Sequence, residues 1–101
     1  MKLDKNIKLS REELHVINRN IKSVQMKFRA ISVFEFIKCE IIKNNGILKM
    51  TIKDINDLYK AKYYKFSYSV MRRIIDELIR LNLIKVIICE NKRAFCLSKY
   101  I

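Results

Sequence analysis

The segment SVMRRIIDELIRLNLI, residues 69–84, decides the fold of this chain. Its apolar residues recur at steps of three and four, the spacing that places side chains along one side of an α-helix. Just upstream stands Ser67, a residue type that caps helix N-termini. The segment therefore predicts a helix that is capped by Ser67 and runs to about Asn82.

The apolar side of this predicted helix is broad. At about 100° per residue it covers an arc of about 180°, from Val70 to Ile79, whereas a surface helix needs only about 100°. A helix that is buried deeply in the core explains such an arc. A dimer interface formed by Ile75 and Ile79, with Tyr68 nearby, explains it equally well.

Two segments rich in Ile, Val and Phe follow, from Leu83 to Cys89 and from Ala94 to Lys99, around the turn sequence Glu90-Asn91-Lys92-Arg93. They predict a β-hairpin in which Cys89 pairs with Ala94. One face of this hairpin is then uniformly apolar and consists of Ile84, Val86, Ile88, Phe95 and Leu97. The other face, too apolar to be fully solvated, consists of Lys85, Ile87, Cys89, Ala94, Cys96 and Ser98. Candidates to cover it are a second copy of the protein or the N-terminal residues Leu3, Ile7 and Leu9.

Upstream, the sequence predicts three further helices and a short strand. A capping box at Ser10-Arg11-Glu12-Glu13 begins a helix over about 12–22. A second helix ends at Asn44-Asn45-Gly46, where a left-handed stop is expected. It is expected to form the core with residues at three- and four-residue steps, namely Val24, Phe28, Ile31, Phe34, Ile37 and Ile41. After a short strand at Ile47–Met50, Thr51 caps a helix over about 52–59, and a basic, aromatic connection leads to the helix that Ser67 caps.

The order helix, short strand, short helix, turn, helix, hairpin is that of a winged helix-turn-helix domain. Residues 69–84 resemble the recognition helix of that family, with Asn82-Leu83-Ile84 where Gly-Leu-Ile is commonest. Ile47–Thr51 is similar to the family's first strand and the N-cap that follows it. The resemblance covers about 24–99, although the segment 55–70 is a few residues longer than the usual second helix and turn.

Length and composition agree with a single domain, since 101 residues have room for one compact core. The resemblance implies a mainly α fold with a small antiparallel sheet (α+β), in which residues 1–22 are an N-terminal extension and helix. No uncharged stretch approaches the about 20 residues of a membrane-spanning helix, and the charged N-terminus predicts a cytoplasmic protein. The odd number of cysteines, Cys39, Cys89 and Cys96, predicts reduced and buried thiols.

The net charge points to a polyanionic partner, since 22 Lys and Arg against 10 Asp and Glu give +12. The densest cationic segment has no acid between Asp57 and Asp76 and contains Lys60, Lys62, Lys65, Arg72 and Arg73. In a winged helix this region approaches the duplex, where Ser67, Tyr68 and Ser69 can also donate to phosphates. An ordinary solvated loop is the alternative.

Two acids lie beside the arginines on the polar side of the predicted helix. Arg72 and Arg73 are candidates for guanine edges or phosphates. Asp76 and Glu77 would repel phosphate there unless each is paired within the protein or reads a cytosine amino group.

The predicted hairpin turn has no such conflict near its tip. Asn91, Lys92 and Arg93 place an amide and two cations on a narrow projection that suits an A·T-rich minor groove. We expect this wing to carry at least as much of the DNA contact as the helix. A turn whose lysine protects a sheet edge is the alternative.

These residues predict a sequence-specific, double-stranded DNA-binding protein that acts as a homodimer alongside other DNA-processing proteins. In its small size, its richness in Lys, Ile and Asn, and its basic wing, the chain resembles the TcpK family of accessory proteins from clostridial conjugative plasmids. That resemblance implies binding at a plasmid origin of transfer, whereas the broader winged-helix family implies a transcriptional regulator. A different class of function is the alternative, namely a protein-interaction module that docks partners through Ile75 and Ile79.

Catalysis, metal binding and cofactors are not expected, because the sequence has no catalytic constellation, Gly-rich phosphate loop or metal-ligand spacing. The lone His15 is predicted to be a surface or capping histidine. Cations in the first two helices, Arg19, Lys22, Lys27 and Arg29, have no assigned role.

Overall fold

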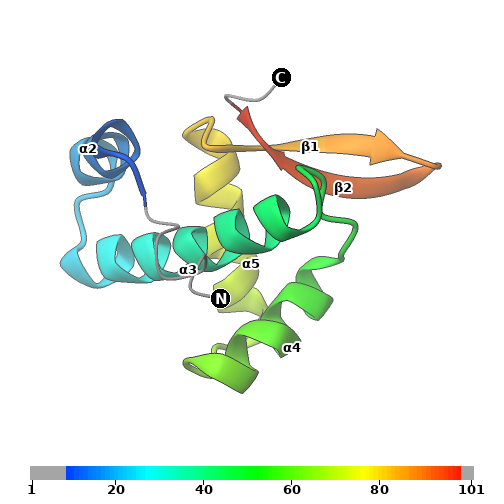
Figure 1. Cartoon of the computed structure of the whole chain (residues 1–101). Coiled ribbons are helices and arrows are strands. Elements are labelled where there is room, and N and C mark those ends of the chain that lie inside the picture. Colours follow the sequence, from blue (N-terminus) through cyan, green and yellow to red (C-terminus); the bar gives the residue numbers. More distant parts are fainter. Residues whose placement is uncertain (1–8, 99–101) are drawn as a thin grey trace.

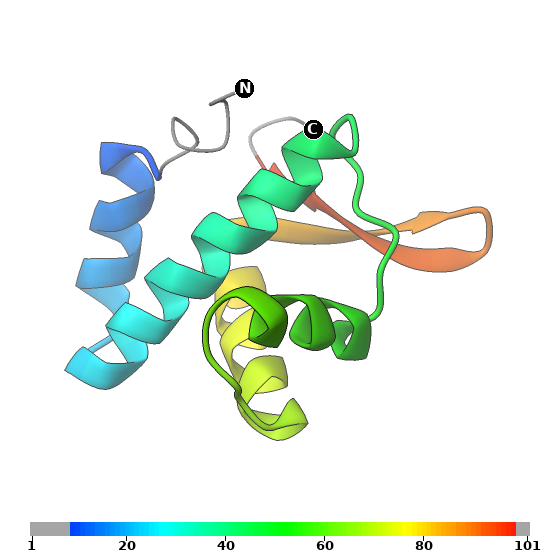
Figure 2. The same cartoon turned by 60° about the horizontal axis from the view of Figure 1, so that its bottom comes forward.

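Four helices and a two-stranded antiparallel sheet make up the part of the chain that the computed structural model describes, residues 9–98 (Figure 1). The elements in chain order are α2 (Arg11–Asn20), α3 (Val24–Lys43), α4 (Ile52–Lys62), α5 (Tyr68–Arg80), β1 (Ile84–Cys89) and β2 (Lys92–Leu97). Both views show α3 crossing the middle of the molecule and the hairpin projecting beyond the helices (Figures 1 and 2). The predicted mainly α fold with a small antiparallel sheet is confirmed, and it is compatible with a winged-helix arrangement.

The helix N-termini follow from local sequence. The Ser10 hydroxyl accepts from the Glu13 backbone N–H at 3.1 Å, and the Glu13 carboxylate accepts from the Ser10 backbone N–H at 2.7 Å. Thr51 and Asp54 form a second capping box at the start of α4. Ser67 caps α5 by accepting from a backbone N–H of the first turn. The three predicted N-caps are therefore confirmed.

The helix C-termini agree less uniformly with expectation. Asn45 and Gly46 have φ angles of 61° and 97°, the left-handed backbone expected just after the end of α3. The helix α4 continues beyond its predicted end to Lys62. As a result Lys60 and Lys62 belong to a helix, and the connection to α5 is shorter than predicted.

The predicted core stripe of α3 is partly wrong. Phe34, Ile37 and Ile41 are fully buried, but Val24 and Phe28 are 65% and 68% exposed. The step size explains the difference, because three consecutive three-residue steps separate Phe28 from Ile37. Each such step falls about 60° short of a full turn, so these two side chains lie on opposite sides of the helix.

The broad apolar arc of α5 is explained by three packing neighbours, α3, α4 and β1. Ile75 has no exposed surface and belongs to the core, so its place in the predicted dimer interface is wrong. Ile79 is half-buried against the core, and Tyr68 is 49% exposed. A helix with neighbours on three sides needs a wider apolar arc than a helix on the surface of a single layer.

The hairpin has a shorter turn than predicted. Cys89 pairs with Lys92, so its predicted pairing with Ala94 is wrong. Glu90 and Asn91 form the whole loop and have φ angles of 54° and 65°, as in a type I′ turn. Because the register differs by two residues, the two faces keep their predicted membership. The two basic residues after the turn, however, lie in β2 rather than at the tip.

One face of the hairpin covers the helices, with Ile84 and Leu97 almost fully buried. The predicted strand at 47–50 is reduced to a single bridge, in which Leu48 and Phe95 exchange two backbone hydrogen bonds of 2.8 and 2.9 Å. This bridge attaches the segment before α4 to β2.

The second face of the hairpin is also partly covered, since Ala94 and Cys96 are buried. Leu9, one of the residues predicted to cover it, is part of the core. Leu3 and Ile7, the others, lie outside the described residues.

None of the three cysteines forms a disulfide within the described residues, in agreement with the predicted reduced thiols, but their predicted burial holds for Cys96 alone. Cys96 is buried, whereas Cys39 and Cys89 are half-buried. Burial raises the pKa of the Cys96 thiol.

A buried ion pair joins α2 to α3. Lys38 Nζ donates to Glu13 Oε1 at 2.8 Å, and neither side chain is more than 10% exposed. The same carboxylate oxygen accepts from the Ser10 backbone N–H in the capping box. Two charges are tolerated in this position because they are paired, and the pair fixes the start of α2 against the core helix.

Replacing Ile75 by Ala should lower the free energy of unfolding by about 2–4 kcal/mol, because it removes methyl groups from a fully buried site. Ile79→Ala is the matched control on the same helix, and it should cost about 1 kcal/mol or less because that side chain is only half-buried. Urea denaturation measures both losses. Equal and small losses would contradict the burial of Ile75.

Candidate nucleic-acid interface

A groove of about 740 Å³ lies between α5, the hairpin and the segment that leads into α4. Its walls comprise Tyr68, Arg72, Asp76 and Ile79 from α5, Val86, Cys89, Glu90, Lys92, Arg93 and Phe95 from the hairpin, and residues 49–54. The structure thus brings together four predicted DNA-binding residues, Tyr68, Arg72, Lys92 and Arg93. Ile79 and Tyr68, which were predicted to belong to a dimer interface, also line this groove.

Cations outnumber acids along this groove. The charged lining residues are Lys49, Lys53, Arg72, Lys92 and Arg93 against Asp54, Asp76 and Glu90. The Glu90 carboxylate accepts from Lys49 Nζ at 3.2 Å, and this hydrogen bond raises the pKa of Lys49. Asp54 accepts from a backbone N–H in its capping box. Lys92 and Arg93 are exposed and form no ion pair with any described residue, so their charges are available to an anion.

The two acids on the polar side of α5 are both paired within the helix. Asp76 lies 3.9 Å from Arg72 Nε. Glu77 accepts from both Nε and Nη2 of Arg80, at 3.1 and 2.8 Å. This bidentate contact lowers the pKa of Glu77 and raises that of Arg80. Pairing reduces the repulsion that either carboxylate would exert on a phosphate nearby.

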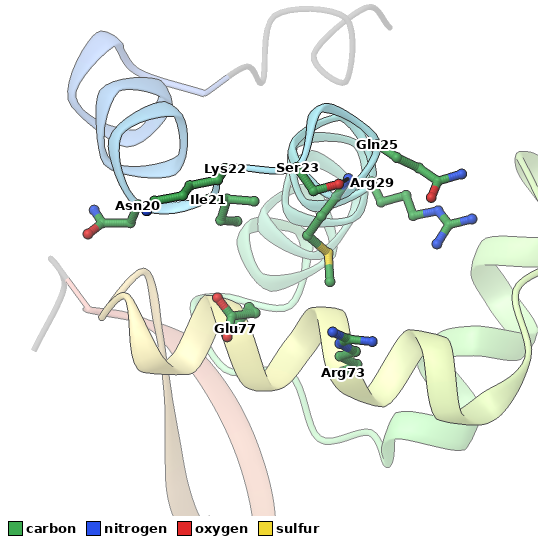
Figure 3. Close-up of a pocket in the computed structure, with 9 residues that line it drawn as sticks. Asn20, Ile21, Lys22, Ser23, Gln25, Arg29, Arg73 and Glu77 are labelled. Carbon is green, nitrogen blue, oxygen red and sulfur yellow. Dashed lines mark hydrogen bonds between the residues drawn. The ribbon is translucent and has the colours of Figure 1, made fainter.

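Several predicted residues do not line this groove. Arg73 follows Arg72 in the helix and therefore points about 100° away. It lines a separate hollow between α5 and α3 (Figure 3). Ser67 and Ser69 are exposed, with their hydroxyl oxygens 3.2 Å apart at the start of α5. Asn91 is exposed in the hairpin turn, between two lining residues.

The three predicted lysines around the end of α4 are exposed, and none lines the groove. Lys60 lies 3.5 Å from Asp57, which also accepts from Lys53 at 3.2 Å. The hydrogen bond from Lys53 lowers the pKa of Asp57. Lys62 and Lys65 have no ion-pair partner among residues 9–98.

Two lining residues of the groove and one exposed residue beside it were missed in the sequence. Lys49 and Lys53 line the groove near the start of α4, and Ile88, 70% exposed, is the cross-strand partner of Arg93. Lys49 reaches the hairpin through the bridge before α4, a contact between distant segments for which no local pattern exists. Ile88 was assigned to the apolar hairpin face, but its exposure depends on how far the hairpin extends past the core, for which no local pattern exists.

Neither a metal site nor a membrane-spanning helix is found in the described chain. His15 is exposed on α2, as predicted. No group of three or more His, Cys, Asp or Glu side chains within residues 9–98 is placed to hold a metal ion. None of the helices described is long and apolar enough to cross a membrane.

Comparison with protein-family models, with curated proteins and with solved structures found no match for this chain. The winged-helix resemblance therefore stays a prediction, and function has to be inferred from the groove and its charges.

The Glu77–Arg80 contact predicts a specific pH dependence. The pKa of Glu77 in the folded protein lies below the ordinary value of 4.5. The contact therefore stabilises the fold at pH values above 4.5, and this contribution is lost as the pH falls through the lower, folded-state pKa. Wild-type protein should lose stability more steeply below pH 4.5 than Glu77→Gln does, as measured by urea denaturation at a series of pH values. Parallel profiles would contradict the contact.

Proposed function

We propose that the protein binds double-stranded DNA through the groove between α5 and the hairpin. The observation that supports this best is the pair Lys92 and Arg93, two exposed cations without an ion-pair partner in the described chain. They stand on a projecting strand and share a groove with Arg72, where the acids already have internal partners. A duplex carries one negative charge per about 1.7 Å of its axis and is the polyanion that suits this arrangement.

The hairpin is the part that we propose to enter the minor groove. Arg93 and the exposed Ile88 are cross-strand neighbours near its end. Arginine is favoured in the narrow minor groove of A·T-rich DNA, and an apolar side chain beside it can wedge between base pairs. The Asn91 amide in the turn can hydrogen-bond base edges. Preference for an A·T-rich site would come from these contacts.

The proposed contribution of α5 is to position the duplex. Arg72 and the Tyr68 hydroxyl line the groove side of this helix and can donate to phosphates. Asp76 stays close to Arg72, which limits how far this guanidinium can reach towards a base. In this proposal α5 positions the duplex and the hairpin selects its sequence.

The cellular role we propose is an accessory factor that binds a plasmid origin of transfer during conjugation and marks it for other DNA-processing proteins. A winged-helix transcriptional regulator would use the same surface and is the alternative. A cytoplasmic location and a homodimer belong to the proposal. A two-fold dimer would read two half-sites, through an interface other than the predicted one, because Ile75 is buried and Tyr68 and Ile79 line the duplex groove.

A protein-interaction module without DNA binding has lost its original support. That alternative relied on exposure of Ile75 and Ile79, and these side chains are fully buried and half-buried. The exposed apolar pair of α3, Val24 and Phe28, lies outside the groove and is a remaining surface in its favour.

Replacing both Lys92 and Arg93 by Ala should weaken duplex binding at least about tenfold. Because two cations that neutralise the charge of the duplex are lost, the slope of log K against log salt should become shallower by about 2. The measurement is fluorescence anisotropy with a duplex selected from random sequences, repeated at several salt concentrations.

Lys85→Ala is the matched control, because Lys85 is exposed on β1 but does not line the groove. It should leave both the affinity and the salt slope nearly unchanged. A double variant that binds the selected duplex as tightly as wild type would exclude the hairpin as the DNA-binding element.

A further inference from the structure

We infer that a second surface, on another side of α5 from the groove, binds single-stranded DNA. This surface, the aromatic-basic face, consists of Lys22, Arg29, Lys62, Tyr63, Tyr64, Lys65 and Arg73. The choice of DNA rather than RNA rests on the proposed function. All of these residues lie outside the duplex groove.

Two tyrosine rings near the end of α4 are open to solvent. Tyr63 and Tyr64 are 61% and 62% exposed. The Tyr63 ring lies 5.2 Å from that of buried Tyr59, and the Tyr64 ring lies 5.1 Å from that of buried Phe66. Tyr59 and Phe66 are stacked on each other at 5.5 Å. The exposed rings are thus held on a packed aromatic layer, which reduces the entropy lost when a base stacks on them.

Cations extend this aromatic layer into a hollow of about 360 Å³ between α5, α3 and the α2–α3 connection (Figure 3). The Arg29 guanidinium lies 5.3 Å from the centre of the Phe66 ring, and it also lines the hollow with Lys22 and Arg73. Figure 3 shows Arg73 pointing from α5 towards α3. Phosphates of one strand can therefore follow the cations of the hollow while its bases reach the tyrosines.

Little negative charge lies near this surface. The one carboxylate that lines the hollow is that of Glu77, and Arg80 already donates to both of its oxygens. Beside the tyrosines, Lys62 and Lys65 are exposed and lack an ion-pair partner within the described chain. The aromatic-basic face is therefore complementary in charge to a phosphate backbone.

Exposed aromatic rings select unpaired bases. In a duplex the faces of the bases are already stacked on each other, whereas a single strand can stack them on protein rings whatever the sequence. Cations that follow the backbone beside such rings are the usual components of a sequence-tolerant single-strand site. Because Arg72 lines the groove and Arg73 lines the hollow, a duplex and an adjoining single strand can be bound together.

The test is fluorescence anisotropy with a labelled oligo-dT of about 15 nucleotides. Tyr63→Leu combined with Tyr64→Leu should lower its affinity about tenfold, because the stacking rings are lost. Tyr63→Phe combined with Tyr64→Phe keeps the rings and should bind as wild type does. Both pairs replace exposed side chains, and thermal melts followed by circular dichroism check that the variants fold.

Two adjacent arginines supply a second matched pair. Arg73→Ala should weaken oligo-dT binding, and Arg72→Ala should leave it unchanged. The proposal is overturned if the wild type does not bind oligo-dT, if the leucine variant binds it as tightly as wild type, or if Arg72→Ala is the more damaging change. Tighter binding to oligo-U than to oligo-dT would overturn the assignment to DNA.

Measuring how the same variants bind the selected duplex distinguishes failure of this proposal from failure of the proposed function. The leucine variant should bind the duplex normally, and the Lys92→Ala/Arg93→Ala variant should bind oligo-dT normally. Failure of duplex binding, with oligo-dT binding still dependent on the tyrosines, would remove the proposed function and leave the single-strand site in place. Loss of oligo-dT binding in the hairpin variant would place the single strand in the duplex groove and overturn the second surface.

Discussion

The structure depends on the burial of α5 against α3, α4 and the hairpin. Met71, Ile74, Ile75 and Leu78 have no exposed surface, and burying each such side chain stabilises the fold by about 1.5–3 kcal/mol. The 11-residue helix α4 is too short to be stable alone in water, so it is held in place by this packing. Because Ser67 sets where α5 begins and three neighbours set its rotation, the residues of the helix that remain exposed are mainly polar.

The same packing decides which charges are free. A net charge of +12 makes the protein repel itself, and some of its few acids form ion pairs within the fold. Glu13 is paired with Lys38 inside the protein, and Glu77 is paired with Arg80 on α5. With the acids engaged in this way, cations on the hairpin and around the α4–α5 connection remain without partners among the described residues. A polyanion bound there would relieve repulsion that the protein cannot relieve by itself.

Local patterns predicted the helices and their caps, because a cap such as that of Ser67 depends on residues within one turn. Features that depend on distant segments were not predictable in this way. An apolar arc cannot distinguish a partner chain from the protein's own core, and Ile75 was therefore open to both explanations. The hairpin turn was misjudged because Glu90-Asn91 lacks the glycine that usually marks a type I′ turn, although both residues adopt positive φ.

The candidate site shows where charge counting along a sequence fails. The segment between Asp57 and Asp76 was correctly found to be rich in cations, but consecutive residues on a helix point about 100° apart. Arg72 consequently lines the groove with Asp76 as its neighbour, and Arg73 lines the hollow together with Glu77. A single charged segment thus supplies two surfaces with different neighbours, one facing a projecting hairpin and the other continuing into exposed aromatic rings. What each surface binds has to be decided separately, because the rotation of α5 places Arg72 and Arg73 in different hollows.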